Sequence, residues 1–408
     1  MRKCLFIAII LIFTIIFVAC ENPFWNVPDK IASDKKELLD PVITWPEGIT
    51  ANLWLEHVKN TQSVPRKLSD VPLTLFTNDN TGAFAWVEPD TELDKLGLQS
   101  YSMIFTPDDG NYKTVTNDVE IRVLLGVEMV EVSVPVGVAF QIGKHLGTAS
   151  GSDITNFHDV TFTRNFSMSK YQVTQEQYEA VIGTNPSYFH GGTGREPATG
   201  EVQEKRPVET VRWYESIVFC NRLSALEGLT PAYSIDGETD PDIWISTHGA
   251  VPTSWIPASR WNFVEIVDDS TGYRLPTDAQ WEYAAKGGMS SSLEGYSYSG
   301  SNNPNEVAWY SGKTGTPTAS RTHEVGLLKA NELGLFDMSG NVYEWCWDWW
   351  GSYTDTAKTD PTGASSGAYR VMRGGGWNNS ATGVRSVNRN YVSPNSRNYS
   401  FGFRLLRP

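Results

Sequence analysis

The strongest constraint on the fold is the small amount of regular helix between residues 127 and 408. Three short segments carry a helical pattern with start and stop residues, at 178–182, 213–227 and 281–286, and a capping box precedes the first and the third. Long loops rich in aromatic residues make up the rest of this stretch. Because buried loops need partners for their backbone groups, we expect side-chain hydrogen bonds, ion pairs or metal ions to hold them.

The composition indicates a globular protein with an acidic exterior. The chain has 408 residues, of which 40% are hydrophobic and 12% aromatic, and this suffices for two or three domains with sizeable cores. Its formal net charge is −14, and no cluster of basic residues is visible. A nucleic-acid partner is therefore not expected, because phosphate binding requires a clustered basic face.

Residues 1–20 have the layout of an export signal. Arg2 and Lys3 precede an apolar run at 5–18, which is too short to span a bilayer comfortably. Cys20 follows a small residue at the end of this run, so the segment resembles a bacterial lipoprotein signal that is cleaved just before a lipid-modified cysteine. An ordinary signal peptide with an incidental cysteine is the alternative. A lipidated Cys20 would anchor the exported protein to the bacterial membrane, in the periplasm or on the outer surface.

The segment that follows divides into a tether and a β-rich domain. Residues 21–40 are polar and charged, as in a flexible tether. Residues 41–125 alternate short β-rich runs with turn clusters, which predicts a small β-sandwich. The runs lie at 42–45, 50–55, 81–87, 101–106 and 119–125. The motif Val42-Ile-Thr-Trp-Pro46, with Phe105-Thr-Pro-Asp108 and Asn111-Tyr112 later, resembles the immunoglobulin-like repeats of treponemal surface proteins. Because this block occurs once, we expect a spacer rather than the binding module.

The region 127–408 contains eight motifs, in this order: Ser169-Lys-Tyr-Gln-Val-Thr174, Val208-Glu-Thr-Val-Arg-Trp213, Tyr273-Arg-Leu-Pro-Thr-Asp278, Gln280-Trp-Glu-Tyr-Ala-Ala285, Asn331-Glu-Leu-Gly-Leu335, Gly340-Asn-Val-Tyr-Glu-Trp345, Arg373-Gly-Gly-Gly-Trp377 and Gly402-Phe-Arg404. In sequence and in order, these motifs resemble those of the formylglycine-generating enzyme, or sulfatase-modifying factor, family. The resemblance implies an α+β fold, an elaborated C-type-lectin-like domain with much irregular structure.

The residues of the family's oxidase reaction are missing. In the family, two cysteines just after the Gly-Gly-Ser-Trp-like motif hold copper(I), a metal that soft thiolates suit. This chain has Asn378, Asn379 and Ser380 at the corresponding place, and no cysteine follows Cys346. We therefore expect no copper and assign no catalytic residue. Cys220 and Cys346 are expected to be buried, and the sequence leaves open whether they pair.

The family resemblance also implies a structural calcium site. The side chains of Asn341 and Glu344 and the carbonyl of Val342 match the positions that help to bind this ion, and hard oxygen ligands suit it. In the alternative interpretation, Asn341 caps a turn and Glu344 pairs with an arginine.

The C-terminal tail has the composition of a contact surface. Tyrosine, serine, glycine and asparagine together give large contact area and adaptable hydrogen bonds. The tail resembles that of retroelement-diversified variable proteins, in which asparagine codons mutate at adenines. The expected ligand-binding positions are Asn379, Ser380, Thr382, Gly383, Asn390, Tyr391, Val392, Ser393, Ser396, Asn398, Tyr399 and Ser400, and the expected scaffold is Trp377, Arg385, Arg389 and Arg397. A polar surface loop with chance similarity is the alternative.

The sequence thus predicts a membrane-anchored lipoprotein that displays a diversified ligand-binding surface on a catalytically inactive domain. The expected partner is an extracellular or surface ligand, a protein or a glycan. Two alternatives stay open, a formylglycine-type oxidase that uses other residues and a structural envelope protein.

Overall fold

The computed structural model describes residue 45 and residues 49–52, 67–71, 81–93, 96–144, 157–288, 295–314 and 320–408. The predicted signal segment, the tether, Cys20 and most of the first predicted strand lie outside these residues. Within them, no helix is long and apolar enough to cross a membrane.

The N-terminal described residues form one twisted sheet. It comprises β1 (Ile49–Asn52), β2 (Gly82–Trp86), β3 (Gly97–Pro107) and β4 (Val115–Leu124), with a short 3-10 helix, η1 (Leu68–Asp70). The strand order is β1-β4-β3-β2, in which β1 is parallel to β4 and the other pairs are antiparallel. Strands therefore occur at four of the five predicted runs. The immunoglobulin-like sandwich stays a prediction, because the described residues contain this one sheet here.

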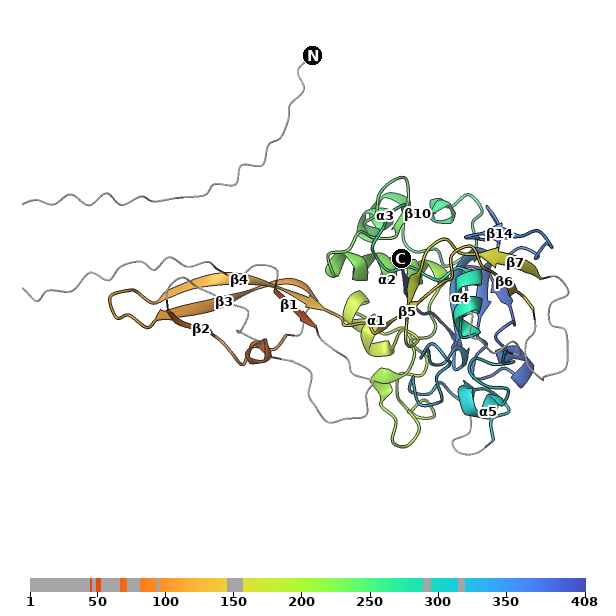
Figure 1. The fold of residues 1–408 in the computed structure, drawn as a ribbon, viewed down its shortest axis with the longest axis horizontal. Helices are drawn as coiled ribbons and strands as arrows, with labels where there is room; N and C mark the ends of the chain where they lie inside the picture. The colour runs from red at the N-terminus through yellow and green to blue at the C-terminus, as the bar shows by residue number, and fades with distance from the viewer. Residues whose placement is uncertain are drawn as a thin grey trace, which may run out of the picture.

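Alternating side chains of the sheet pack on one small core. Met103, Val119, Ile121 and Val123 are all buried, together with Trp86 from β2. This alternation follows from the two-residue period of a strand, which sends successive side chains to opposite faces. The sheet extends as an arm from the larger C-terminal domain (Figure 1).

The arm is joined to the C-terminal domain by polar contacts at its base. Arg122 in β4 donates through Nη1 to the carbonyl oxygen of Leu226 over 3.0 Å. The backbone N–H of Leu125 donates to Oε1 of Glu227 over 3.3 Å. Both acceptor residues lie at the C-terminal end of one helix, and the carbonyl of Leu226 is one of the terminal carbonyls that lack a partner within that helix.

The C-terminal domain contains the three predicted helices and two further short ones. They are α1 (Gln175–Ile182), α2 (Trp213–Leu226), α3 (Pro241–His248), α4 (Asp278–Ala285) and α5 (Pro304–Val307), with 3-10 turns η3 (Gln203–Lys205), η4 (Arg260–Phe263) and η5 (Ala381–Val384). The capping boxes of α1 and α4 are formed as predicted. The sequence analysis missed α3 and α5, whose sequences are short and start at a proline after an Asp or Asn cap.

The strands of this domain form several small sheets. The largest has the order β16-β15-β13-β17, with β13 (Tyr343–Trp349), β15 (Arg370–Arg373), β16 (Asn390–Val392) and β17 (Phe401–Gly402). The others are β5 (Met129–Val132) with β8 (Phe166–Ser169) and β18 (Leu406–Arg407), β6 (Ala139–Ile142) with β7 (His158–Thr161) and β14 (Lys358–Thr359), β9 (Tyr233–Ser234) with β10 (Glu265–Ile266), and β11 (Ala308–Trp309) with β12 (Ser339–Gly340).

Strand β13 divides the core of the domain. All seven of its residues are buried, and they alternate between two clusters: Trp345 packs with α2, whereas Cys346 packs with α4. Cys220 belongs to the α2 cluster, and both thiols are free. The prediction that Cys220 and Cys346 are buried is thus confirmed, and their positions on opposite sides of β13 keep them apart.

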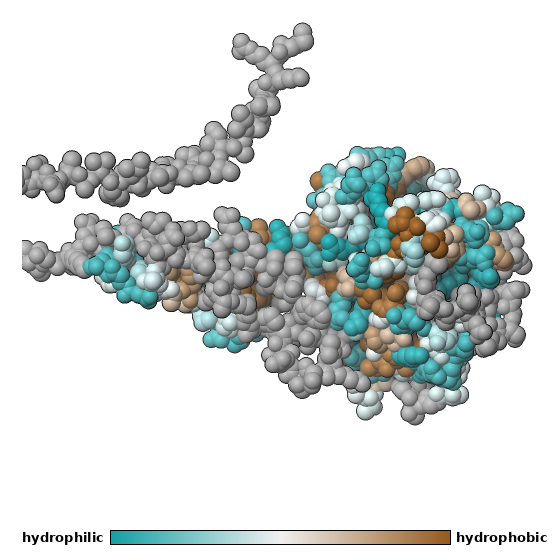
Figure 2. Space-filling model, viewed as in Figure 1, coloured by the Kyte–Doolittle hydropathy of each residue, from teal (hydrophilic) through white to brown (hydrophobic). Residues whose placement is uncertain are grey.

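The surface of the domain is mixed. Figure 2 shows apolar patches among hydrophilic side chains on the face in view. Among the side chains that the structure describes, fourteen large apolar ones are exposed, and four of these are tyrosines near the tail or within it: Tyr188, Tyr369, Tyr391 and Tyr399. Exposed aromatic residues gathered in one region often mark a contact surface.

Candidate functional site

The predicted site begins at β15, which lies between β13 and β16 in the largest sheet. Its antiparallel partner β16 is an edge strand, with Val371 opposite Tyr391 and Met372 opposite Asn390. The tail therefore returns to the sheet from which it starts. Loops and turns connect β15, β16 and β17, and these loops carry most of the predicted contact positions.

The turn after β15 requires glycine. Gly374 and Gly375 have φ values of 84° and 70°, in the left-handed region that disfavours other residues. A Cβ atom on Gly375 would lie 2.4 Å from the carbonyl oxygen of Gly383. The glycine run thus lets two parts of the tail touch, and a larger side chain would separate them.

Arg373 connects the tail to α4. It is fully buried, and its Nε and Nη2 atoms donate to the carboxylates of Asp278 and Glu282, each over 2.5 Å. Its Nη1 atom donates to the carbonyl oxygens of Ser386 and Asn388 over 3.1 and 3.2 Å. One side chain thereby joins the sheet, the helix and the loop that precedes β16, and these charge-assisted bonds are of the strong kind.

Two of the predicted scaffold arginines have carboxylate partners. Arg389 pairs through Nη2 with Asp278 over 2.8 Å, and its guanidinium carbon lies 3.8 Å from the ring centre of Tyr353. Arg397 forms two bonds to the carboxylate of Glu215 at the start of α2. Arg385, the third, is buried. The arrangement of these side chains holds the tail against α2 and α4.

The predicted contact positions differ in exposure. Four are exposed, namely Ser380, Thr382, Tyr391 and Tyr399. Seven are half-buried: Asn379, Gly383, Asn390, Val392, Ser393, Ser396 and Asn398. The exposed four lie on the loop after Trp377, on β16 and on the loop before β17. These are the positions from which a side chain can reach a ligand directly.

The prediction that Ser400 is a contact position is wrong. Ser400 is 2% exposed, and its hydroxyl donates to Oδ1 of Asn398 over 2.9 Å. Its Cβ atom lies 3.0 Å from the place where a Cβ on Gly376 would be. Close packing against the glycine turn removes Ser400 from the surface, and no local sequence pattern signals that contact.

Some half-buried asparagines stabilise turns. Asn379 accepts a hydrogen bond from the backbone N–H of Gly376 at Oδ1 and donates through Nδ2 to the hydroxyl of Tyr343 over 3.1 Å. Asn398 accepts from the backbone N–H of Ser400. Such local side-chain to backbone bonds are typical of asparagine in loops. They explain the asparagine content of the tail without any ligand.

Two aromatic clusters flank the tail. Tyr399 packs with Trp377 at 5.6 Å and with Tyr188 at 5.7 Å between ring centres. Trp377, a predicted scaffold residue, donates a hydrogen bond from its Nε1 to the carbonyl oxygen of Tyr399. Arg195 lies over the ring of Tyr188 at 4.0 Å.

The second cluster surrounds Tyr391. Its ring centre lies 4.4 Å from that of Trp350 and 5.2 Å from that of Tyr369. Arg389 lies over Trp350 at 4.2 Å. The sequence analysis missed the partners Tyr188, Tyr369 and Trp350, which lie outside the tail and which no motif identifies.

The residues expected to bind calcium do not fit that ion. Both oxygens of Glu344 are occupied, because Oε2 accepts from Arg404 and Trp281 over 2.6 Å each and Oε1 accepts from Arg404 and Gln172 over 2.9 Å each. Asn341 bonds through both side-chain atoms to the backbone of His323. The carbonyl of Val342 accepts from Gln172 over 3.1 Å. The guanidinium of Arg404 supplies the positive charge, as the alternative interpretation expected.

These features define a mixed helix and strand domain of one family. Residues 127–408 match the sulfatase-modifying factor enzyme 1-like domain, and the chain belongs to that family. A solved structure similar to it is Treponema denticola variable protein 1, which is 34% identical, with a TM-score of 0.56 over 76% of this chain and 99% of that protein.

Two curated relatives are also similar. Chaperone protein LppX of Paenibacillus barcinonensis is 40% identical over 262 residues, which cover 60% of this chain and 80% of LppX. The formylglycine-generating enzyme of Streptomyces coelicolor is 32% identical over 173 residues, which cover 38% of this chain and 52% of the enzyme. The match to the enzyme thus spans about half of its length.

Proposed function

We propose that this protein is an exported lipoprotein that displays a ligand-binding surface on a catalytically inactive domain. Its C-terminal tail forms this surface on a C-type-lectin-like scaffold, and the N-terminal sheet is an immunoglobulin-like spacer. The observation that carries the proposal is the pair of exposed tyrosines, Tyr391 and Tyr399, on a tail that ion pairs attach to α2 and α4. The ligand is an extracellular protein or glycan.

Preorganisation supports the proposal. Arg373, Arg389 and Arg397 attach the tail to α2 and α4 through carboxylates that have little or no contact with water. Ordering a loop on binding costs conformational entropy, and a loop that is already fixed avoids most of this cost. The exposed positions between these arginines can then vary without refolding of the domain, as the resemblance to diversified tails implies.

Aromatic contact area supports it further. Tyr391 is 46% exposed and Tyr399 is 41% exposed, and each is backed by a second aromatic ring. Tyrosine is enriched among residues that dominate binding energy, because its large ring has few rotatable bonds. Arg195, which is half-buried beside the Tyr188 ring, adds a donor for acidic or hydroxyl groups to the first cluster.

The relatives favour a binding function over an oxidase. The name of one relative denotes a chaperone and that of a similar solved structure denotes a variable protein. The positions that follow Trp377 are Asn378, Asn379 and Ser380, whose hard amide and hydroxyl groups bind copper(I) poorly. A second candidate function, a chaperone for another exported protein, would use the same exposed aromatic clusters to hold apolar segments.

The test is a double substitution, Tyr391→Ala with Tyr399→Ala, in the purified mature chain. Ligands are first identified on arrays of extracellular proteins and glycans. Loss of two anchors should weaken binding at least about a hundredfold. The free energy of unfolding should change by about 1 kcal/mol or less, because both side chains are half exposed.

One control variant and three contrary outcomes belong to this test. The control is Leu98→Ala, which should leave binding unchanged. Leu98 is an apolar residue on β3 and is 48% exposed. Unchanged binding by the tyrosine double variant would reject the tail as the contact surface. Oxygen-dependent turnover of a cysteine peptide after copper loading would establish the oxidase instead. Suppressed aggregation of many unrelated denatured proteins would favour the chaperone.

A further inference from the structure

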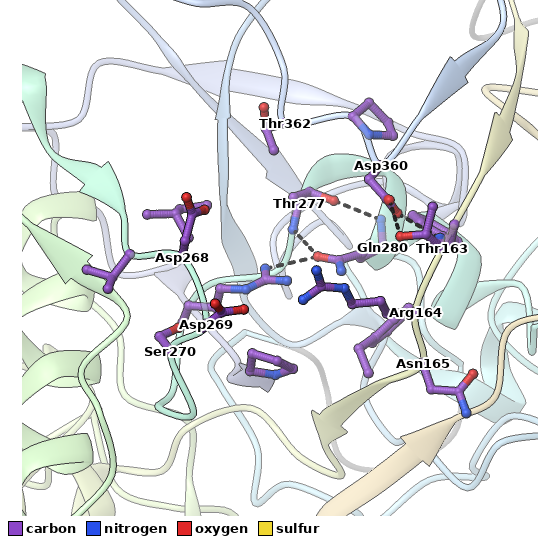
Figure 3. Close-up of a pocket in the computed structure, with 17 residues that line it drawn as sticks. Thr163, Arg164, Asn165, Asp268, Asp269, Ser270, Thr277, Gln280, Asp360 and Thr362 are labelled. Atoms are coloured by element: carbon purple, nitrogen blue, oxygen red, sulfur yellow. Dashed lines mark hydrogen bonds between the residues drawn. The ribbon is translucent and has the colours of Figure 1, made fainter.

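The domain contains a cavity that is separate from the tail surface. It has a volume of about 310 Å³, and none of the predicted contact positions line it. Its walls come from the turn between β7 and β8, the loop after β10, the first turn of α4 and the loop after β14 (Figure 3). Cavities of this size are at the lower end of small-molecule sites.

A guanidinium without a carboxylate partner faces this cavity. Arg274 donates through Nη1 to the carbonyl oxygen of Leu275 and to Oε1 of Gln280, each over 3.0 Å. Among the described residues, its Nε and Nη2 atoms make no hydrogen bond and no carboxylate lies within 4.0 Å. Burial lowers the pKa of Arg274 below its usual value. Arg274 is half-buried, and an anion placed beside a partly desolvated cation that has no carboxylate partner would stabilise it.

Arg164 provides a second positive group beside the first. It is exposed and lies on the turn between β7 and β8. Figure 3 shows its side chain pointing into the space beside Gln280, and none of its atoms forms an ion pair with a described residue. Two guanidinium groups that converge on one space match the paired oxygens of a carboxylate.

Negative groups line another part of the same cavity. Asp268 and Asp269 are adjacent exposed residues of the loop after β10, and neither pairs with a described cation. Asp360 is different, because it accepts hydrogen bonds from the backbone N–H and the hydroxyl of Thr163. Positively and negatively charged side chains thus line one cavity without forming ion pairs with each other. Both kinds of charge are therefore available to a ligand.

Apolar residues close the remaining walls. Phe162 and Phe166 are buried at 2% and 3% exposure, and Ile266 and Pro361 lie nearby. These side chains suit a short aliphatic or aromatic group and lower the local dielectric, which strengthens charge recognition.

We propose that this cavity binds a small zwitterion of the α-amino acid class. Its carboxylate pairs with Arg274 and Arg164, and its ammonium group pairs with Asp268 or Asp269. The residues that line this cavity differ from the predicted contact positions of the tail. Amino-acid binding can therefore be tested separately from the function proposed above.

The test is titration calorimetry on the full mature chain with each of the free L-α-amino acids. At least one should bind saturably with a dissociation constant below about 1 mM. For that amino acid, the N-acetyl derivative and the carboxamide should each bind at least about tenfold more weakly, because each lacks one of the two charges. Arg164→Gln and Asp268→Asn with Asp269→Asn should have similar effects.

The variants are chosen so that a folding defect cannot be mistaken for lost binding. Arg164 makes no hydrogen bond or ion pair with another residue in the described part of the chain. Arg274→Lys keeps a positive charge but loses the planar guanidinium. Arg222→Gln on α2, where Arg222 pairs with Asp242 at the surface, is the matched control and should bind like the wild type. Absence of saturable binding up to about 10 mM, or equal binding of the uncharged derivatives, would overturn the proposal. Tyr391→Ala with Tyr399→Ala should leave this binding intact.

Discussion

Glu344 and Arg404 show how one residue pair organises the centre of the domain. Both are fully buried, and the guanidinium bonds both carboxylate oxygens while its Nη1 and Nη2 atoms donate to the carbonyls of Ser169 and Phe336. Gln172 completes the set with a bond to Oε1 of Glu344. Each charge is therefore compensated by its partner, and removal of one would leave the other buried and unpaired.

We predict that Glu344→Gln lowers the free energy of unfolding by about 3–5 kcal/mol, measured by urea denaturation. The cause is the uncompensated charge of Arg404. The double variant Glu344→Gln with Arg404→Met should lose less than the sum of the single losses, because it removes both charges.

The same pair bears on metal binding. Addition of EDTA should leave the melting temperature unchanged, since Arg404 occupies the carboxylate that calcium would need. A rise in melting temperature on addition of calcium that disappears in Glu344→Gln would contradict this account.

The tail loop is organised as an element whose inner and outer residues have different roles. Arg373, with the glycine turn, fixes its inner side, whereas Ser380 and Thr382 are exposed on its outer side and share a hydrogen bond of 2.9 Å. Ser400 belongs to the inner side in spite of its serine side chain. The tail has a similar composition along its length, but its side chains differ in how deeply they are buried.

We predict that Ser380→Tyr and Thr382→Asn each change the free energy of unfolding by less than about 0.5 kcal/mol. Both side chains are exposed, so larger groups meet water rather than protein. By contrast, Ser400→Asn should cost about 1–3 kcal/mol, because extra atoms would be forced against Gly376. Equal tolerance at all three positions, measured by denaturant unfolding, would show that the loop does not pack as described.

The whole molecule combines an N-terminal sheet with a C-terminal domain that contains several buried acidic groups. Burial raises the pKa of Glu209 to about 7, although hydrogen bonds from Thr210 and from the backbone of Phe189 oppose the shift. Burial likewise raises the pKa of Asp337 to about 6. Burial lowers the pKa of His158 below its usual value of 6.5, so a fall in pH destabilises the fold through His158 and stabilises it through Glu209 and Asp337.

Glu209 gives a pH-dependent prediction. Its folded pKa of about 7 exceeds its usual value of 4.5, so its contribution to stability is fully present below pH 4.5 and is lost as the pH rises through 7. Glu209→Gln removes this loss. The stability of the variant relative to wild type should therefore rise by about 2–3 kcal/mol between pH 4.5 and 8 in urea denaturation. A pH-independent difference would show that Glu209 stays ionised in the fold.

Local sequence patterns specify those elements whose formation depends on residues that are neighbours in the chain. The capping boxes of α1 and α4 and the family motifs are local patterns, and so are the β-rich runs of the N-terminal sheet, four of which coincide with described strands. The tertiary structure alone decided which arginine meets which carboxylate, that Ser400 is buried and that Glu344 holds Arg404 rather than an ion. These contacts join residues separated by tens to hundreds of positions, and in a domain built largely of loops no helical or strand period relates them to one another.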